Sequence, residues 1–163
     1  MLYGSSLLSF TACGQIMTYD QQLNLLYSNS VPRIQPDTLS KWMQQHSDSL
    51  IVLDIRSEEE YAVSHIREAR FVDYESFEPS RLADLDTTRK VVVYCSVGYR
   101  SERVGEKLGN LGFDEVYNLY GGIFQWKNQG YEVVNPGGNV TDSVHTYNRR
   151  WGKWLEKGVK VYE

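Results

Sequence analysis

The chain has 163 residues, of which 41% are hydrophobic and 23% are charged; this usage excludes a disordered protein and predicts one packed domain. Its formal net charge is −4 and it has no long basic run, which argues against a nucleic-acid partner, because phosphate backbones are held mainly by clustered Lys and Arg. No apolar stretch approaches the ~20 residues that a membrane-spanning helix needs.

Residues 1–30 carry a signal-like stretch followed by a polar linker. The sequence LLSFTAC ends at Cys13 after small residues and resembles the end of a bacterial lipoprotein signal, in which the cysteine is lipidated. We therefore expect a location in the cell envelope or periplasm, with membrane contact only through a lipid on Cys13. No Lys or Arg precedes Cys13, so the alternative is an N-terminal tail with an incidental thiol on a cytoplasmic protein. The polar, weakly patterned residues 15–30 predict a linker or a loosely attached arm.

The packed domain is expected over residues 31–134, where helical and strand patterns alternate. Residues 36–45 place apolar side chains at helical spacing behind an Asp-Thr start signal. Residues 50–56 form a continuous apolar run of the kind that is buried on both faces of a parallel sheet. Ser57 and Glu60 then have the spacing of a capping box, which predicts a helix that begins there.

The second half of this domain repeats the alternation. The predicted segments are a short strand around Phe71, a helical segment from Pro79, a strand over Lys90–Cys95, a helix from Arg100 that stops at Gly112, a strand over residues 115–120 and a short helix over residues 123–130. Strands that alternate with helices predict the α/β fold class, with a mostly parallel sheet and helices on both faces. In such sheets ligands bind at the carboxyl ends of the strands, which is where Cys95 stands.

The stretch CSVGYRS, residues 95–101, combines a thiol with flexible residues and an arginine. A loop that curls from a strand into a helix points several backbone N–H groups at one centre, and the helix N-terminus adds positive partial charge. This environment favours the thiolate, which is the nucleophilic form of Cys95. Arg100 adds a permanent cation, and Gly98 permits a backbone conformation barred to other residues. The alternative, a cysteine that only packs, explains neither the Gly-x-Arg-Ser sequel nor the position at a strand end.

Three motifs, in order, resemble those of the rhodanese family of sulfurtransferases. CSVGYRS is similar to the active-site signature of Cys, two variable residues, Gly, one variable residue, Arg and Ser. LDIRSEEEYAVSHIREA, residues 53–69, resembles the upstream motif, and LYGGIFQW, residues 119–126, resembles the downstream one. Ser64 stands where the family usually has Gly, and we expect a strained left-handed serine there with a local adjustment. The resemblance implies a rhodanese-like three-layer sandwich around a mostly parallel five-stranded sheet.

The resemblance also implies a two-step covalent reaction that needs no metal or other cofactor. The Cys95 thiolate would take a sulfane sulfur from thiosulfate or a similar small anionic donor, hold it as a persulfide, and pass it to cyanide or a thiol. Arg100 would help to hold the donor and the loop, and the ring of Tyr99 would shape the entrance. The remaining substrate-binding residues would contribute mainly backbone amides; they are Ser96, Val97, Gly98, Tyr99 and Ser101.

Four further residues are interpreted as structural support. We expect Asp54 to pair with Arg100, and Arg56 to pair with Glu60, so that both pairs organise the loop without reacting. His65 is interpreted as a structural histidine bonded near a helix end. A general base is not needed, because the loop itself stabilises the thiolate.

Two other functions fit parts of the pattern. The dual-specificity cell-cycle phosphatases share this fold and a Cys-to-Arg loop, but the family relation links their activity to a loop one residue longer than the six residues from Cys95 to Arg100. The second alternative is a module that stores sulfur or binds a protein through Cys95 without turnover. The presence of both Cys95 and Arg100 favours a competent enzyme.

Residues 135–163 lie beyond the resemblance and form a C-terminal extension. Tyr147, Trp151, Trp154 and Leu155 recur at roughly helical spacing, which predicts an amphipathic helix laid on the domain. The alternative is a helix that covers the active-site mouth or meets a protein partner, because an aromatic and Arg-rich composition suits interfaces.

Overall fold

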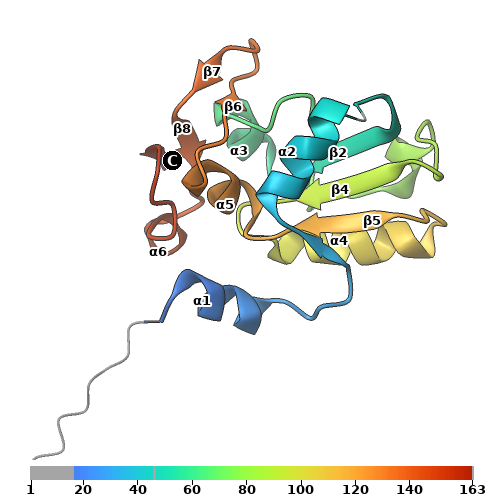
Figure 1. Ribbon diagram of the computed structural model, residues 1–163, viewed down its shortest axis with the longest axis horizontal. Coiled ribbons are helices and arrows are strands. Elements are labelled where there is room, and N and C mark those ends of the chain that lie inside the picture. Colours follow the sequence, from blue (N-terminus) through green and yellow to red (C-terminus); the bar gives the residue numbers. More distant parts are fainter. Residues whose placement is uncertain (1–16, 46, 163) are drawn as a thin grey trace, which may run out of the picture.

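The core of the protein is a five-stranded sheet, seen in a computed structural model that describes residues 17–45 and 47–162 (Figure 1). Its strands are β1 (Arg33–Ile34), β2 (Leu50–Asp54), β3 (Arg70–Phe71), β4 (Lys90–Tyr94) and β5 (Val116–Leu119). Their order is β1-β5-β4-β2-β3, and every pairing between neighbours is parallel. The predicted fold class is therefore confirmed.

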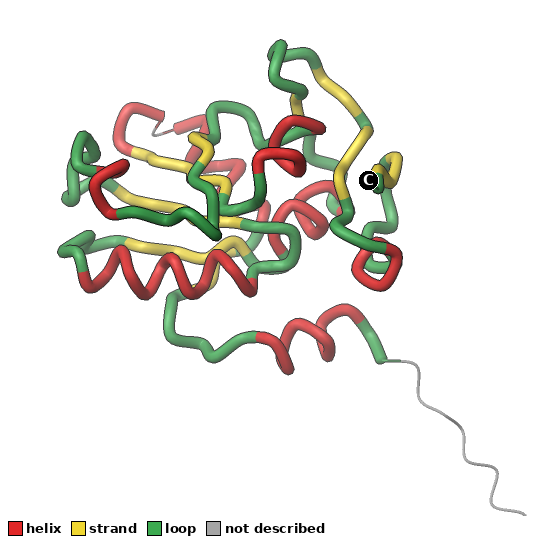
Figure 2. Tube along the Cα trace, turned by 180° about the vertical axis from the view of Figure 1, so that it is seen from behind, coloured by secondary structure: helices red, strands yellow, loops and turns green. Residues whose placement is uncertain are grey.

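Helices cover both faces of this sheet. They are α2 (Pro36–Gln45), α3 (Glu58–Val63), α4 (Tyr99–Asn110) and α5 (Gly122–Asn128), with short 3-10 turns η1 (Ser47–Ser49) and η2 (Pro79–Leu82). Figures 1 and 2 both show α4 running along one side of the strands, while α2 and α5 lie on the other. Alternate residues of β4 enter two separate apolar cores, because successive side chains of a strand point to opposite faces.

The segment before the sheet is a packed element, and the prediction of a loosely attached arm is wrong. Residues Tyr19–Leu26 form helix α1, which begins with a capping box between Thr18 and Gln21. Leu23 is fully buried, and the Tyr19 hydroxyl donates to the Gly121 carbonyl at 2.9 Å. The lipobox-like segment and Cys13 lie outside the described residues, so the lipid anchor stays a prediction.

The C-terminal extension also differs from the prediction, because no long amphipathic helix forms over residues 135–162. The chain makes an antiparallel pair, β6 (Val133–Val134) with β7 (Val140–Thr141), and a parallel pair, β8 (Ser143–His145) with β9 (Val159–Val161). Between β8 and β9 stands only the four-residue helix α6 (Arg149–Gly152). Val144 and Leu155 are fully buried in the larger apolar core. The aromatic spacing therefore reflects contacts with the domain and not a helical stripe.

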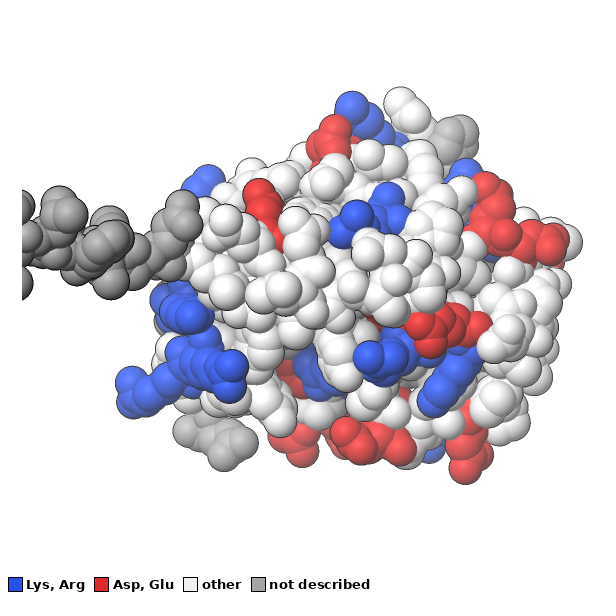
Figure 3. Space-filling view, turned by 90° about the horizontal axis from the view of Figure 1, so that it is seen from below, with Lys and Arg blue, Asp and Glu red and all other residues white. Residues whose placement is uncertain are grey.

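Acidic and basic side chains both lie on the face of the protein seen in Figure 3. On the face shown in Figure 3, acidic and basic side chains are interspersed with uncharged surface. None of the helices within residues 17–45 and 47–162 is long and apolar enough to cross a membrane.

Candidate active site

Cys95 follows the last residue of β4 and lies at the carboxyl edge of the parallel sheet. Its side chain is 1% exposed, and its Sγ accepts a hydrogen bond from the Gly98 N–H at 3.1 Å. Gly98 has a φ of +97° and caps the N-terminus of α4 without a side-chain hydrogen bond. The first N–H groups of a helix have no partner within the helix, so the α4 terminus presents positive partial charge beside the sulfur. The loop therefore places one backbone N–H and the N-terminus of α4 beside the sulfur.

Arg100 is held on the loop by a buried carboxylate. Its two terminal amino groups, Nη1 and Nη2, donate to the two oxygens of Glu60 at 2.7 and 2.8 Å. The Ser96 hydroxyl donates to Glu60 at 2.6 Å and also accepts from Arg100 Nη2 at 3.0 Å. Burial by itself would raise the pKa of Glu60, but the hydrogen bonds and charge of Arg100 outweigh burial and lower that pKa to about 2. Glu60 is thus ionised at neutral pH and clamps both ends of the loop.

The predicted ion pairs are wrong in their partners. Asp54 and Arg56 pair with each other at 2.7 Å, both side chains being fully buried, and Glu60 pairs with Arg100 instead. Asp54 also accepts a hydrogen bond from the Tyr94 hydroxyl at 2.6 Å. Asp54 and Arg56 are two residues apart at the end of β2, so their proximity is local. By contrast, Glu60 is far from Arg100 in the sequence, and it reaches the Cys95 loop only because α3 lies beside that loop.

Ser64 and His65 take structural positions at the end of α3. Ser64 is extended, with φ −170°, so the expected left-handed strain is absent; its hydroxyl donates to the Ser143 carbonyl at 2.6 Å. His65 Nδ1 lies 3.3 Å from the Tyr61 carbonyl, and its ring stacks on Tyr61 at 3.9 Å between centroids. Burial lowers the pKa of His65. These contacts account for His65 without a role as a base.

Two buried side chains that the sequence did not single out hold the loop in shape. The Tyr27 hydroxyl donates to the Val97 carbonyl at 2.6 Å and accepts from the Gly121 N–H at 2.9 Å. Asn118 on β5 donates to the Gly98 carbonyl at 2.9 Å and accepts from the Ser101 hydroxyl at 2.8 Å. No local motif marks either residue, because Tyr27 lies on a separate element and Asn118 looks like any strand residue.

The glycine pair after β5 has a steric role in the site. The N–H of Ile123 donates to the Cys95 carbonyl at 2.9 Å, so the start of α5 touches the back of the loop. A Cβ on Gly122 would collide with that same Cys95 carbonyl. Close approach of the two backbones therefore requires glycine here.

A pocket of about 490 Å³ opens above the loop. Its lining residues are Leu26, Glu75, Cys95, Ser96, Val97, Tyr99, Arg100, Tyr147 and Trp151. The structure brings five of the predicted site residues, Cys95, Ser96, Val97, Tyr99 and Arg100, together in this pocket, whereas Gly98 and Ser101 are not among its lining residues. Leu26 and Glu75 were not predicted as site residues, and the C-terminal extension, which contributes Tyr147 and Trp151, was placed at the active-site mouth only as an alternative.

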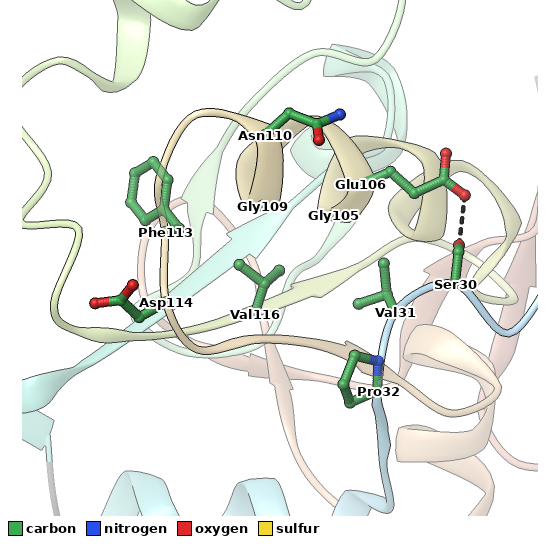
Figure 4. A pocket seen from close by; sticks show the side chains of 10 residues that line it. All are labelled: Ser30, Val31, Pro32, Gly105, Glu106, Gly109, Asn110, Phe113, Asp114 and Val116. Atoms are coloured by element: carbon green, nitrogen blue, oxygen red, sulfur yellow. Dashed lines mark hydrogen bonds between the residues drawn. The ribbon is translucent and has the colours of Figure 1, made fainter.

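A second pocket, of about 510 Å³, lies between α4 and the chain that leads into β1 (Figure 4). Gly105 and Gly109 leave it open, and the Ser30 hydroxyl donates to Glu106 at its edge. It contains no cysteine, histidine or basic side chain, so we place the chemistry at Cys95. Within residues 17–45 and 47–162, no three His, Cys, Asp or Glu side chains are grouped as a metal site would need.

Comparison with known proteins finds similar sequences and similar folds. A sulfurtransferase of Allochromatium vinosum is 34% identical over 108 residues, which cover 66% of this chain and 99% of that protein. A tRNA uridine(34) hydroxylase of Cytophaga hutchinsonii is 36% identical over 83 residues, which cover 48% of this chain but only 27% of the hydroxylase. The rhodanese-like domain of the Alr3790 protein from Anabaena shares the fold, with a TM-score of 0.58 at 23% identity over 64% of this chain and 79% of that one. The family model of the rhodanese-like domain matches residues 35–129, more than half of the sequence, and the chain belongs to that family.

Proposed function

We propose that this protein is a sulfurtransferase that carries a sulfane sulfur as a persulfide on Cys95. The observation that carries the proposal is the hydrogen bond from the Gly98 N–H to Cys95 Sγ at the N-terminus of α4. A donor aimed at the sulfur stabilises negative charge there, both on the thiolate before the reaction and on the persulfide after it.

In the first step, the Cys95 thiolate attacks the outer sulfur of thiosulfate. A bond forms between Sγ and that sulfur, and the sulfur–sulfur bond of thiosulfate breaks with its electron pair leaving on sulfite. Two negative charges enter on thiosulfate and two leave on sulfite, so the persulfide retains the single negative charge of the thiolate. No proton has to move, which explains why the site needs no general base.

In the second step, a nucleophilic acceptor takes the outer sulfur from the persulfide. Cyanide attacks that sulfur, thiocyanate leaves, and the electron pair of the broken bond restores the Cys95 thiolate. A thiol acceptor would react in the same way through its thiolate. In both steps Arg100 and Glu60 keep the loop closed around the sulfur, and the proposed cycle uses no cofactor.

The test is the intact mass of the purified protein, measured after thiosulfate and again after cyanide. The wild type should gain the mass of one sulfur atom and lose it to cyanide with thiocyanate released, whereas Cys95→Ser should gain nothing. A protein that gains sulfur but does not turn over would be a sulfur carrier. No gain from thiosulfate or from a persulfide donor would sink the proposal, and hydrolysis of an aryl phosphate would then be measured to examine phosphatase chemistry.

A further inference from the structure

We propose that the aromatic mouth above Cys95 selects a sulfur donor with an apolar organic body, such as an aryl thiosulfonate, over a small inorganic or methyl donor. The inference rests on the proposed function, because it assumes that a donor loads sulfur on Cys95. It concerns the far wall of the pocket, where Tyr147 and Trp151 face the loop from the C-terminal extension.

The pocket is larger and more apolar than an inorganic donor requires. Its volume of about 490 Å³ lies in the ~300–1,000 Å³ range of pockets that enclose organic ligands. Beyond the loop itself, the walls are Leu26 of α1, Tyr99 of α4, and Tyr147 and Trp151 of the extension, with Glu75 as the charged residue at the rim. Three aromatic rings and a leucine above a reactive sulfur form a site for an apolar or aromatic group.

The position of Tyr147 shows that the surrounding structure constrains this wall. Tyr147 has a φ of +63°, a left-handed conformation that is unfavourable for a bulky side chain. The conformation is held by the fully buried Thr146 before it and by a hydrogen bond from the Tyr147 N–H to His145 Nδ1 at 3.2 Å. It leaves the ring 5.8 Å from the Arg100 guanidinium and 55% exposed. Such strained residues cluster at functional sites, where surrounding contacts over-determine them.

The charge around the mouth also disfavours a highly charged donor. The two terminal amino groups of Arg100 are already bonded to the ionised Glu60, so much of the cationic charge is neutralised within the protein. Glu75 adds a negative charge at the rim. A thiosulfonate carries one negative charge where thiosulfate carries two, so it meets less repulsion from these carboxylates.

The chemistry of such a donor balances at the same sulfur. The Cys95 thiolate attacks the outer sulfur of the thiosulfonate, and the bond between that sulfur and the sulfonyl sulfur breaks. The electron pair leaves on the sulfinate, and the outer sulfur stays on Cys95 as the persulfide. One negative charge enters with the donor and one leaves with the sulfinate, and the organic group occupies the aromatic mouth until the sulfinate that carries it leaves.

The selecting residues lie outside the stretch that defines the family. The family model ends at residue 129, before Tyr147 and Trp151, and begins after Leu26. The 108-residue match to the sulfurtransferase of Allochromatium vinosum covers 99% of that protein, and it is shorter than the range from Leu26 to Trp151. At least one wall of this pocket therefore has no counterpart in that relative.

The test compares benzenethiosulfonate with methanethiosulfonate, two donors of the same charge, with cyanide as acceptor and thiosulfate as a third donor. The readout is the ratio of kcat/KM for the phenyl donor to that for the methyl donor, measured in the wild type and in a Tyr147→Ala/Trp151→Ala variant. Intrinsic donor reactivity cancels when the two proteins are compared. We expect the ratio to fall roughly tenfold in the variant, the loss expected for aromatic contacts, with little change for thiosulfate.

Two control variants separate contact from general damage. Tyr147→Phe keeps the ring and should keep the wild-type ratio. Tyr131→Ala removes an aromatic ring that stacks on Trp126 at 4.5 Å outside the pocket, and it should also keep the ratio. If the double variant does not fold, Tyr147→Ala alone is measured instead. Tyr147 is more than half exposed, so this variant should fold, and it should lower the same ratio by a smaller factor.

The possible results distinguish this inference from the proposed function. An unchanged ratio in a folded variant that still forms the persulfide would overturn the aromatic mouth and leave the sulfurtransferase intact. A wild type in which none of the three donors adds sulfur to Cys95 would overturn both. A fall in the ratio that appears only when Tyr147 and Trp151 are truncated would support the organic donor.

Discussion

Glu60 is the side chain on which the geometry of the candidate loop depends most. It is 1% exposed, and it accepts hydrogen bonds from both terminal amino groups of Arg100 and from the Ser96 hydroxyl. Glu60 also makes a local contact: it accepts a hydrogen bond from the Ser57 N–H at 3.1 Å as part of the α3 capping box. One carboxylate therefore both begins a helix and ties down the anion-binding loop.

The first prediction concerns the pH dependence of this contact in Glu60→Gln. The pKa of Glu60 is lowered in the folded protein from its ordinary value of 4.5 to about 2, so ionised Glu60 stabilises the fold above pH 4.5, and that contribution is lost as the pH falls to about 2. Breaking the pair should cost about 3 kcal/mol at pH 7. Urea unfolding from pH 7 to pH 2 should show the difference between wild type and variant shrinking across that window.

An exposed neighbour in the same helix supplies the control. Glu58→Gln changes an exposed carboxylate of α3 and should change the free energy of unfolding at pH 7 by less than about 0.5 kcal/mol. A difference between Glu60→Gln and wild type that stays constant from pH 7 to pH 2 would contradict the role given to the ionised carboxylate.

At the scale of elements, α1 belongs to the folded domain and forms one side of the site. Tyr27, which follows α1, bridges the Cys95 loop and the turn before α5, while Leu26 lines the pocket. In the chain that follows α1, the N–H groups of Ser28 and Ser30 donate hydrogen bonds to Glu102 on α4 at 2.9 and 3.1 Å. The chain from α1 to β1 is thus attached to the loop and to the helix that follows it.

The second prediction compares two leucines of α1. Leu23 is fully buried, whereas Leu25 is 72% exposed. Leu23→Ala should lower the free energy of unfolding by about 3 kcal/mol, because it leaves a cavity in the larger core, and Leu25→Ala should change it by less than about 0.5 kcal/mol. Chemical denaturation of both variants tests this. Equal, small effects would mean that α1 is not packed on the domain in solution.

At the scale of the whole molecule, the C-terminal extension returns to the helices around the site. Asn128, at the end of α5, donates to the Trp154 carbonyl at 2.9 Å and accepts from the N–H groups of Glu156 and Lys157 at 2.7 and 3.2 Å. Trp154 also stacks on Tyr19 of α1 at 5.3 Å. These contacts join α1 and α5 to the chain that follows α6, and so hold the wall that carries Trp151.

The third prediction tests this attachment with Asn128→Ala. Loss of its three hydrogen bonds should speed amide hydrogen exchange at Glu156 and Lys157 by roughly tenfold, while amides of β4 keep their protection. Gln129→Ala, an exposed change at the next position, is the control and should leave exchange in the extension unaltered. Unaltered exchange in Asn128→Ala would show that other contacts hold the extension.

The sequence by itself determined the features that depend on local pattern. Apolar runs predicted β2 and β4, the Ser57–Glu60 spacing predicted the start of α3, and the strand-to-helix turn placed Cys95 at the edge where ligands bind. These features follow from periodicity and capping within a few residues. The same locality explains why the family motifs of residues 53–69, 95–101 and 119–126 could be recognised.

Only the tertiary structure decided which distant side chains meet. Arg100 pairs with Glu60 and not with Asp54, because α3 packs against the loop while the shorter connection pairs Asp54 with Arg56. The polar residues before the sheet gave no sign that Tyr27 enters the site, and the spacing of the C-terminal aromatics suggested a helix where the chain forms separate contacts. Composition cannot encode these pairings, since burial and partners depend on the packing of elements far apart along the chain.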